Sequence, residues 1–171
     1  MDIEAVALRG SATPIAVVFT RLGRAEAVTL VSVVAAVVAL ARHNDLRPVA
    51  LVVASQVLSQ AVIALSKRVF RRVRPDGWLL YRERDLSYPS GHAATAIVFY
   101  GWFAALALRD PGIPHALALA LAVPPALCVA GLPWSRLALG AHYATDVLGG
   151  ALFAVGWSCA AAALLVAVGV V

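Results

Sequence analysis

Three short stretches of the chain combine residue types that can bind and transfer a phosphoryl group. They read KRVFRRVRP from Lys67 to Pro75, SYPSGHAATA from Ser87 to Ala96, and WSRLALGAHYATD from Trp134 to Asp146. In the first, arginine offers a planar fork that suits two phosphate oxygens at once, and lysine supplies a compact charge. Taken alone, such a basic run is more typical of a topology signal or of contact with anionic lipid.

The second stretch has the features of a helix start that can hold an anion. Ser90 is placed to cap the helix, Pro89 ends any helix before it, and Gly91 lets the backbone approach a ligand closely. Bare N–H groups at a helix N-terminus attract anions, and His92 lies beside them in the sequence. Considered alone, the stretch fits an ordinary helix cap with His92 facing water equally well.

In the third stretch, His142 and Asp146 are spaced i and i+4, which predicts that they share one face of a helix. A carboxylate one turn along can accept the Nδ1 proton of the imidazole and leave Nε2 bare as a nucleophile or base. The plainer alternative is a salt pair that caps the helix. An ionisable pair at the edge of an apolar segment nevertheless indicates a functional site by default.

The elements that must position these residues are apolar helices. Of the 171 residues, 62% are hydrophobic and only 13% are charged, and the mean hydropathy is +0.87. A soluble core of this size could not bury so much apolar surface, so the sequence predicts an integral membrane protein with a single domain over residues 1–171. Cys128 and Cys159 lie in apolar stretches and predict small buried side chains, with neither a disulfide nor a metal site.

The predicted fold class is all-α, a multi-pass transmembrane helical bundle of about five spans. A short amphipathic helix that starts near Thr13-Pro14 is expected to lie in the membrane interface before them. The second span carries a polar stripe, which should face other helices and not lipid. Five stretches are long enough to span a bilayer: Ala25–Ala41, Pro48–Leu65, Ala93–Leu108, Ile113–Leu132 and Tyr143–Val168.

Two connections between these spans carry the chemistry. They run from Ser66 to Ser90 and from Gly131 to Asp146. Because consecutive spans alternate in direction, both connections must emerge on the same face of the membrane. Their side chains can therefore meet in one site.

Taken together, the three stretches form a pattern that is highly specific. Lys67 precedes Arg74-Pro75 by six residues, Pro89-Ser90-Gly91-His92 follows, and Ser135-Arg136 is followed after five residues by His142 and after three more by Asp146. The chain resembles the type 2 phosphatidic acid phosphatase (PAP2) superfamily, whose signature is K-x6-RP, PSGH and SR-x5-H-x3-D. Every position of that signature is matched, and the resemblance covers roughly residues 55–156.

The resemblance implies a helical bundle that cleaves phosphate monoesters or pyrophosphates without a metal or other cofactor, through a phosphohistidine. It implies that His142 is the nucleophile, that Asp146 orients it, and that His92 protonates the leaving oxygen. The groups that would hold the phosphoryl oxygens are Lys67, Arg74, Ser90, the backbone N–H of Gly91, and Arg136. Three fixed cations can supply the charge stabilisation that magnesium supplies elsewhere.

Several alternatives stay open beside this hypothesis. The signature is also similar to that of vanadium-dependent haloperoxidases, but those are larger soluble proteins. A phosphatase of a soluble sugar phosphate, similar to glucose-6-phosphatase, is harder to exclude, and a non-catalytic lipid-binding or transport module is a further alternative. The expected partners are a lipid phosphate substrate and membrane lipids, with no nucleic acid. Phosphatidic acid, phosphatidylglycerol phosphate, undecaprenyl pyrophosphate and prenyl-linked sugar phosphates would all present the same terminal phosphate.

The distribution of basic residues predicts the orientation of the site. Eleven of the 14 Lys and Arg residues fall on the side that carries the motifs, and three fall opposite, namely Arg42, Arg47 and Arg109. Because basic loops stay in the cytoplasm, we expect a multi-pass protein of the cell membrane whose site faces the cytoplasm.

Overall fold

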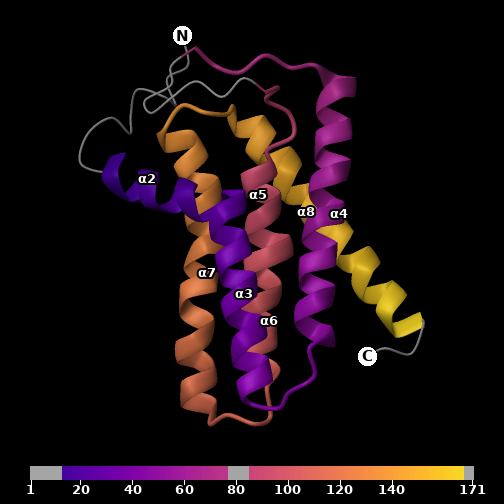
Figure 1. The fold of residues 1–171 in the computed structure, drawn as a ribbon. Coiled ribbons are helices and arrows are strands. Elements are labelled where there is room, and N and C mark those ends of the chain that lie inside the picture. Colours follow the sequence, from indigo (N-terminus) through magenta and orange to yellow (C-terminus); the bar gives the residue numbers. More distant parts are fainter. Residues whose placement is uncertain (1–12, 77–84, 168–171) are drawn as a thin grey trace.

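The computed structural model describes residues 13–76 and 85–167, and the regular structure of these residues is helical (Figure 1). In chain order the helices are α2 (Thr13–Leu22), α3 (Ala25–Ala41), α4 (Arg47–Phe70), α5 (Gly91–Thr95), the π-helical turn η1 (Ala96–Gly101), α6 (Trp102–Arg109), α7 (His115–Ala138) and α8 (Ala144–Ala167). The predicted all-α bundle is confirmed. The prediction of one domain over residues 1–171 stays a prediction.

Four helical runs in the described part of the chain are long and apolar enough to cross a membrane. They are α4, the continuous run α5–η1–α6, α7 and α8. A fifth span is present if α2 and α3, which meet at a bend of 61°, are counted as one broken span. The chain is therefore a multi-pass membrane protein, and the predicted number of about five spans is the upper count.

Two of the spans continue further than predicted. α4 ends at Phe70 and not at Leu65, and α7 ends at Ala138 and not at Leu132. An apolar window ends at the first charges, whereas the backbone hydrogen bonds of a helix continue past them. Lys67, Ser135 and Arg136 consequently lie in the last turns of helices, which fixes them more firmly than the predicted connections would. The predicted end of the last span, Val168, lies outside the described residues.

The run α5–η1–α6 is the centre of the bundle. Its first turns are built from small side chains, and Ala93, Ala94 and Ala96 are fully buried. Small residues let helix backbones approach closely. On α8, a Cβ added to Gly150 would collide with the backbone carbonyl oxygen of Ser90. The PSGH stretch is therefore held in the middle of the helices that surround it.

The polar stripe of α4 faces inward as predicted. Gln56 donates a hydrogen bond to Thr95 Oγ1 at 2.8 Å, and Gln60 donates to the carbonyl of Gly91 at 3.2 Å. Ser55 accepts a hydrogen bond of 2.9 Å from the indole of Trp157. The stripe thus ties α4 to α5 and α8.

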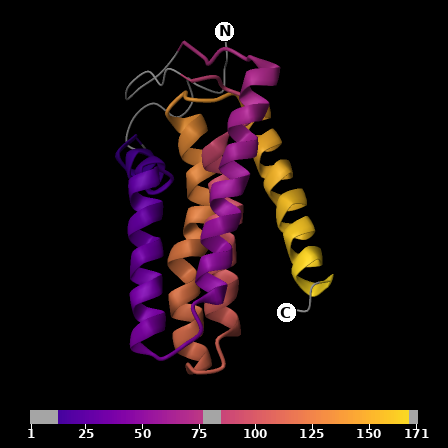
Figure 2. The ribbon, with the colours of Figure 1, turned by 45° about the vertical axis from the view of Figure 1, so that its right-hand side comes forward.

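The outer surface of the bundle is apolar. Large side chains such as Leu30, Val57 and Leu152 are more than half exposed, which suits contact with lipid tails. Cys128 is buried as predicted, but Cys159 is exposed on α8, so the prediction of a buried side chain is wrong there. Figure 2 shows α8 diverging from the other helices toward its C-terminal end.

The predicted N-terminal amphipathic helix is present as α2, which crosses the end of α7 (Figure 1). Its side chains divide into two faces, since Ala16 and Thr20 are buried whereas Ile15 and Val18 are more than half exposed. The buried face packs on α7. α2 is therefore attached to the bundle at the end where the motifs lie.

Candidate functional site

The three motifs meet around a cavity of about 450 Å³ at one end of the bundle. Lys67, Arg74, Gly91, His92 and His142 line it, and the corner between α2 and α3, residues 23–26, forms a further wall. The remaining predicted site residues, Ser90, Arg136 and Asp146, are buried and do not line the cavity. The expectation that the two motif-bearing connections share one face is confirmed.

His142 and Asp146 are neighbours, although the reason given by the sequence is wrong. Asp146 lies in the first turn of α8, but His142 precedes that helix, so the pair does not share a helix face. His142 Nδ1 is 3.5 Å from Asp146 Oδ2. Ser87 lies against both, because its hydroxyl donates to Asp146 Oδ2 and is 3.3 Å from His142 Nδ1. The backbone N–H of Tyr143 donates to the same carboxylate oxygen at 3.0 Å.

The contact between Arg74 and His142 fixes the tautomer of the imidazole. Arg74 Nη1 is 2.9 Å from His142 Nε2. A guanidinium can only donate, so Nε2 is the acceptor and the proton of the neutral ring is on Nδ1, which faces Ser87 and Asp146. Burial, together with the charges of Arg74, Arg136 and Lys67, lowers the pKa of His142 to about 4, against the hydrogen bond to Asp146, which raises it. His142 is therefore neutral near pH 7, with a bare Nε2.

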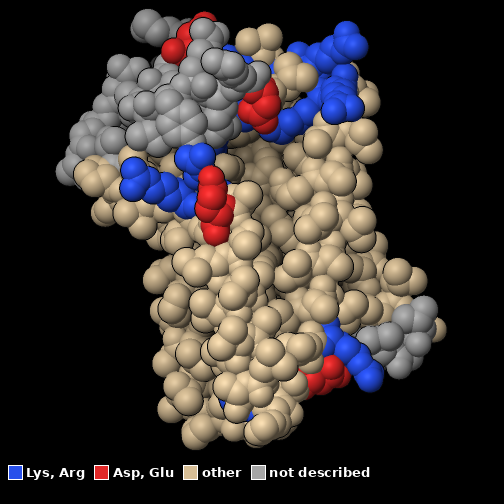
Figure 3. Space-filling model, in the orientation of Figure 1, with Lys and Arg blue, Asp and Glu red and all other residues tan. Residues whose placement is uncertain are grey.

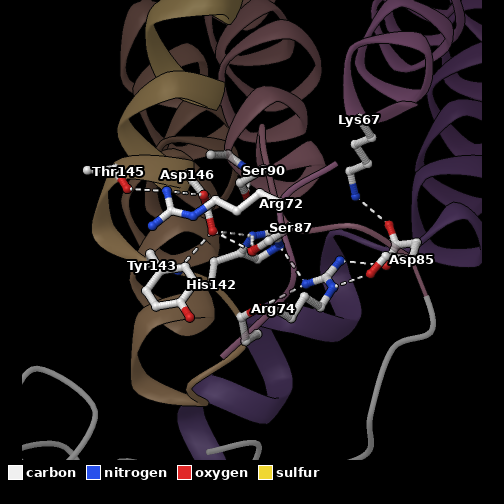
Figure 4. A network of polar contacts seen from close by, with 12 residues as sticks. Lys67, Arg72, Arg74, Asp85, Ser87, Ser90, His142, Tyr143, Thr145 and Asp146 are labelled. Atoms are coloured by element: carbon white, nitrogen blue, oxygen red, sulfur yellow. Dashed lines mark hydrogen bonds and ion pairs between the residues drawn. The ribbon is translucent and has the colours of Figure 1, made fainter. Parts of the chain in front are cut away.

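Two of the predicted phosphate ligands are bridged by a carboxylate (Figure 4). Asp85 accepts from Lys67 Nζ through one oxygen and from Arg74 Nη2 at 2.6 Å through the other, and its backbone carbonyl accepts from Arg74 Nε at 3.0 Å. Burial would raise the pKa of Asp85, but the hydrogen bonds and charges of Lys67 and Arg74 outweigh it and hold the pKa below its usual value. An ionised carboxylate thus sits between the cations as two phosphate oxygens would.

Ser90 caps α5, as its position in the sequence predicts. Its hydroxyl accepts from the backbone N–H of Ala93 at 3.4 Å, and its own N–H donates to the carbonyl of Asp146 at 3.0 Å. Both contacts hold the start of α5 against the start of α8. Gly91 lines the cavity beside it, where its carbonyl is held by Gln60.

Arg136 and His92 meet at α2. Arg136 Nη1 donates to Thr20 Oγ1 at 2.5 Å, and His92 Nε2 is 3.0 Å from the carbonyl oxygen of the same residue. Arg136 is 1% exposed and Thr20 is 3% exposed. α2 therefore contacts two predicted site residues through Thr20.

Sequence reasoning missed four residues that contact the predicted set. Arg72 donates to Asp146 Oδ1 at 2.9 Å and lies 4.2 Å above the ring of Tyr143. Arg72 and Ser87 lie inside the quoted stretches, so their position was a usable signal. Asp85 and Thr20 carried no signal in the sequence, because their contacts depend on the tertiary fold.

The two aromatic residues beside the third motif have structural contacts. The ring of Tyr143 supports Arg72, and Trp134 packs edge-on against Phe19 of α2 with ring centroids 6.3 Å apart. Neither residue lines the described cavity. Both aromatic side chains therefore pack within the protein.

Chemically, the cavity joins an anion site to a nucleophile. Lys67 and Arg74 provide fixed cations, and the bare Nε2 of His142 lies within hydrogen-bond distance of Arg74. His92 lines the same cavity and can exchange a proton. Such an arrangement can bind a phosphate, attack its phosphorus and protonate the departing oxygen.

Comparisons with known proteins agree with this geometry. A family model described as the PAP2 superfamily matches residues 48–169, which include every predicted site residue. A decaprenylphosphoryl-5-phosphoribose phosphatase of Mycolicibacterium smegmatis is 36% identical over 120 residues, which are 68% of this chain, and the chain spans 59% of that relative's length. The crystal structure of a transmembrane PAP2 type phosphatidylglycerolphosphate phosphatase from Bacillus subtilis superimposes with a TM-score of 0.74 at 21% identity, over 91% of this chain and 79% of the other.

The position of Asp85 generates a prediction about anion binding. An oxyanion that binds Lys67 and Arg74 must first displace the carboxylate, so the Asp85→Asn variant should bind inorganic phosphate or vanadate about tenfold more tightly, as expected if the carboxylate occupies the site in roughly nine of ten molecules. Isothermal titration calorimetry of the purified protein in nanodiscs measures this.

Asp110→Asn is the matched control, because Asp110 is paired with Arg42 at 2.5 Å at the opposite end of the bundle. Its phosphate affinity should equal that of the wild type. Weaker binding by Asp85→Asn would show instead that Asp85 holds the two cations in place for phosphate.

Proposed function

The chain belongs to the PAP2 superfamily, and we propose that it is a metal-independent membrane phosphatase that hydrolyses a lipid phosphate through a phosphohistidine on His142. The observation that carries the proposal is the bare Nε2 of His142, held neutral at the edge of a cavity that Lys67 and Arg74 also line. A site that only bound a lipid headgroup would have no need of such a nucleophile.

In the first step, Arg74 Nη1 transfers its hydrogen bond from His142 Nε2 to a phosphoryl oxygen, and the freed lone pair of Nε2 attacks phosphorus as the ester oxygen leaves. The N–P bond forms, the P–O bond breaks, and His92 gives its proton to the departing oxygen. The positive charge that develops on the imidazole is stabilised through Nδ1–H by Asp146, which Arg72 and Ser87 hold in place.

In the second step, water attacks the phosphohistidine. His92, now neutral, takes a proton from the water, the N–P bond breaks, and inorganic phosphate leaves with His142 neutral again. Lys67 and Arg74, which line the cavity, stabilise the charge on the phosphoryl oxygens in both steps, and the buried charge of Arg136 supports them. The backbone N–H of Gly91, at the helix start that Ser90 caps, acts beside them. Phosphoryl transfer needs mainly positioning and charge stabilisation, so fixed cations can serve without a metal ion.

The class of substrate that fits best is a phosphate monoester of a lipid-linked polyol. The names of the two similar proteins describe a phosphoribose and a glycerol phosphate attached to lipids. The cavity lies at one end of the apolar bundle, where a lipid tail can stay in the bilayer while the phosphate enters. Asp85 lines the cavity, and its carboxylate disfavours the second charged phosphate of a pyrophosphate, whereas Glu26 in the wall at residues 23–26 is paired with Arg24 at 3.5 Å.

A hydrolysis assay on purified protein tests the proposal. Phosphate release should be fastest from a lipid-linked polyol monoester, slower from a prenyl pyrophosphate and slowest from free glucose 6-phosphate, and it should persist in EDTA. His142→Ala should lower kcat/KM by on the order of 10³-fold or more. Asp146→Asn should lower it by about 10²-fold, because a neutral amide no longer stabilises the positive charge that develops on the imidazole.

Asp110→Asn serves again as the matched control and should retain full activity. Near-normal turnover by His142→Ala would contradict the assignment of the nucleophile. Loss of all activity in EDTA that a divalent cation restores would contradict the metal-free mechanism.

The protonation state of His142 sets the acid limb of the pH profile. With a pKa lowered to about 4, the free enzyme keeps its nucleophile neutral down to that pH, so the acid limb of kcat/KM should lie near pH 4. Since His92 must be protonated to donate, the profile should also fall at high pH and be bell-shaped.

The acid limb of kcat should lie at higher pH than that of kcat/KM. A bound phosphate offsets the charges of Lys67 and Arg74, which help to lower the pKa of His142. An acid limb of kcat/KM near the ordinary histidine value of about 6.5 would contradict the burial of His142 beside Arg74.

We propose further that the cavity faces the cytoplasm and that the membrane is the cell membrane. Figure 3 shows Lys and Arg gathered at the cavity end of the bundle. The described residues there are Arg21, Arg24, Lys67, Arg68, Arg71, Arg72, Arg74 and Arg136, against Arg42, Arg47 and Arg109 at the other end. Of the predicted set, Arg9, Arg82 and Arg84 lie outside the described residues. The positive-inside rule supports a cytoplasmic cavity.

Single cysteines test the orientation. In a Cys128→Ala, Cys159→Ala background, Asp76→Cys and Asn44→Cys place exposed thiols at opposite ends of the bundle. In intact cells, a membrane-impermeant thiol reagent should label position 44 and not position 76. Permeabilised cells, in which both positions react, are the control. Labelling of position 76 alone in intact cells would reverse the orientation.

A further inference from the structure

Helix α2 lies outside residues 48–169, the part of the chain that the family model matches. Its residue Thr20 nevertheless contacts two motif residues at once, Arg136 through the hydroxyl and His92 through the backbone carbonyl. We propose that Thr20 is a positioning residue for phosphoryl transfer, which orients Arg136 for phosphate binding and His92 for proton donation. This inference rests on the proposed function of the site.

The hydroxyl contact determines how Arg136 is presented. The guanidinium is almost fully buried, and the Nη1–Oγ1 distance is 2.5 Å. A hydrogen bond to one corner of a rigid planar fork fixes the directions of its other N–H groups. The charge of Arg136 reaches the reaction centre, because it helps to lower the pKa of His142. A guanidinium that lost this contact would keep its charge and lose one of the contacts that orient it.

The carbonyl contact determines where the imidazole of His92 lies. The Nε2–O distance is 3.0 Å, and a carbonyl can only accept, so Nε2 carries a proton in this contact. On the same side, a Cβ added to Gly23 would collide with His92 Cδ2 and come within 3.0 Å of Cγ and Nε2. The ring is thus held between the end of α2 and the glycine that follows it.

The end of α2 is itself fixed by contacts with η1 and α7. Tyr100 donates a hydrogen bond of 2.7 Å to the carbonyl of Leu22. A Cβ added to Gly131 of α7 would collide with the ring of Phe19, so α2 lies directly on α7. The contacts of Thr20 therefore belong to a packed corner of the bundle, and residues 23–26 of that corner line the cavity.

Two substitutions at position 20 separate orientation from packing. Thr20→Val keeps the shape and removes the hydroxyl, whereas Thr20→Ser keeps the hydroxyl. Thr20→Val should weaken the binding of vanadate or inorganic phosphate and lower kcat/KM, each by about tenfold, as expected for the loss of one hydrogen bond to a charged group. Thr20→Ser should recover most of that loss. Thr29→Val, at an exposed position of α3, should match the wild type.

Gly23→Ala tests the placement of His92. A displaced acid matters only where the leaving oxygen needs a proton, so kcat should fall at least tenfold on a lipid alkyl phosphate and stay within about twofold on p-nitrophenyl phosphate. Gly156→Ala is the matched control, because a Cβ there meets nothing within 4 Å. The proportion of folded protein is measured for each variant by size-exclusion chromatography.

Three results would overturn the inference. The first is a Thr20→Val variant that equals the wild type in phosphate affinity. The second is a Thr20→Ser variant whose phosphate affinity and kcat/KM are as low as those of Thr20→Val. The third is a Gly23→Ala variant that hydrolyses the alkyl phosphate and p-nitrophenyl phosphate with equally reduced kcat. Because phosphate binding by calorimetry does not require turnover, it tests Thr20 even if the wild type hydrolyses no lipid phosphate. A wild type that hydrolyses no lipid phosphate would refute the proposed function and not the role of Thr20 in orienting Arg136.

Discussion

The hydrogen bond from Arg74 to His142 Nε2 is the interaction on which the rest of the site depends. Burial lowers the pKa of the imidazole and the charge of Arg74 adds to that effect, so the ring is kept neutral, and the contact places its proton on the far nitrogen. The same guanidinium holds Asp85 through a second edge. One side chain thus presents both the nucleophile and the anion site, and a phosphate that replaces Asp85 would arrive beside the atom that attacks it.

The fold supplies this interaction by bringing helix ends together. Lys67 is in the last turn of α4, Ser90 caps α5, and Asp146 is in the first turn of α8, so each is held by regular backbone. The N-terminus of α5 points at the cavity, as an anion site requires. Buried polar side chains of α4 and small residues of α5 and α8 let these ends approach closely, while the outer faces of the helices stay apolar for lipid.

The sequence predicted the spans and the meeting of the motifs because both follow from simple constraints. Apolar segments must cross the bilayer, and alternating direction puts the connections 66–90 and 131–146 on one face. It failed where tertiary packing decides. His142 reaches Asp146 from outside α8, since the chain turns sharply after α7. Thr20 and Asp85 have no motif, and their contacts join segments that lie far apart or in an irregular connection.

The most direct test of the central claim is to trap the phosphoryl group on His142. In a His92→Ala variant, p-nitrophenyl phosphate can still transfer its phosphoryl group, because its leaving group needs no acid, while hydrolysis of the intermediate lacks its base. Alkaline quenching, which preserves phosphohistidine, followed by mass spectrometry of the digested protein should locate the phosphate on His142, and the His92→Ala, His142→Ala double variant should carry none. A phosphate on any other residue, or a double variant labelled as fully as the single one, would contradict the account.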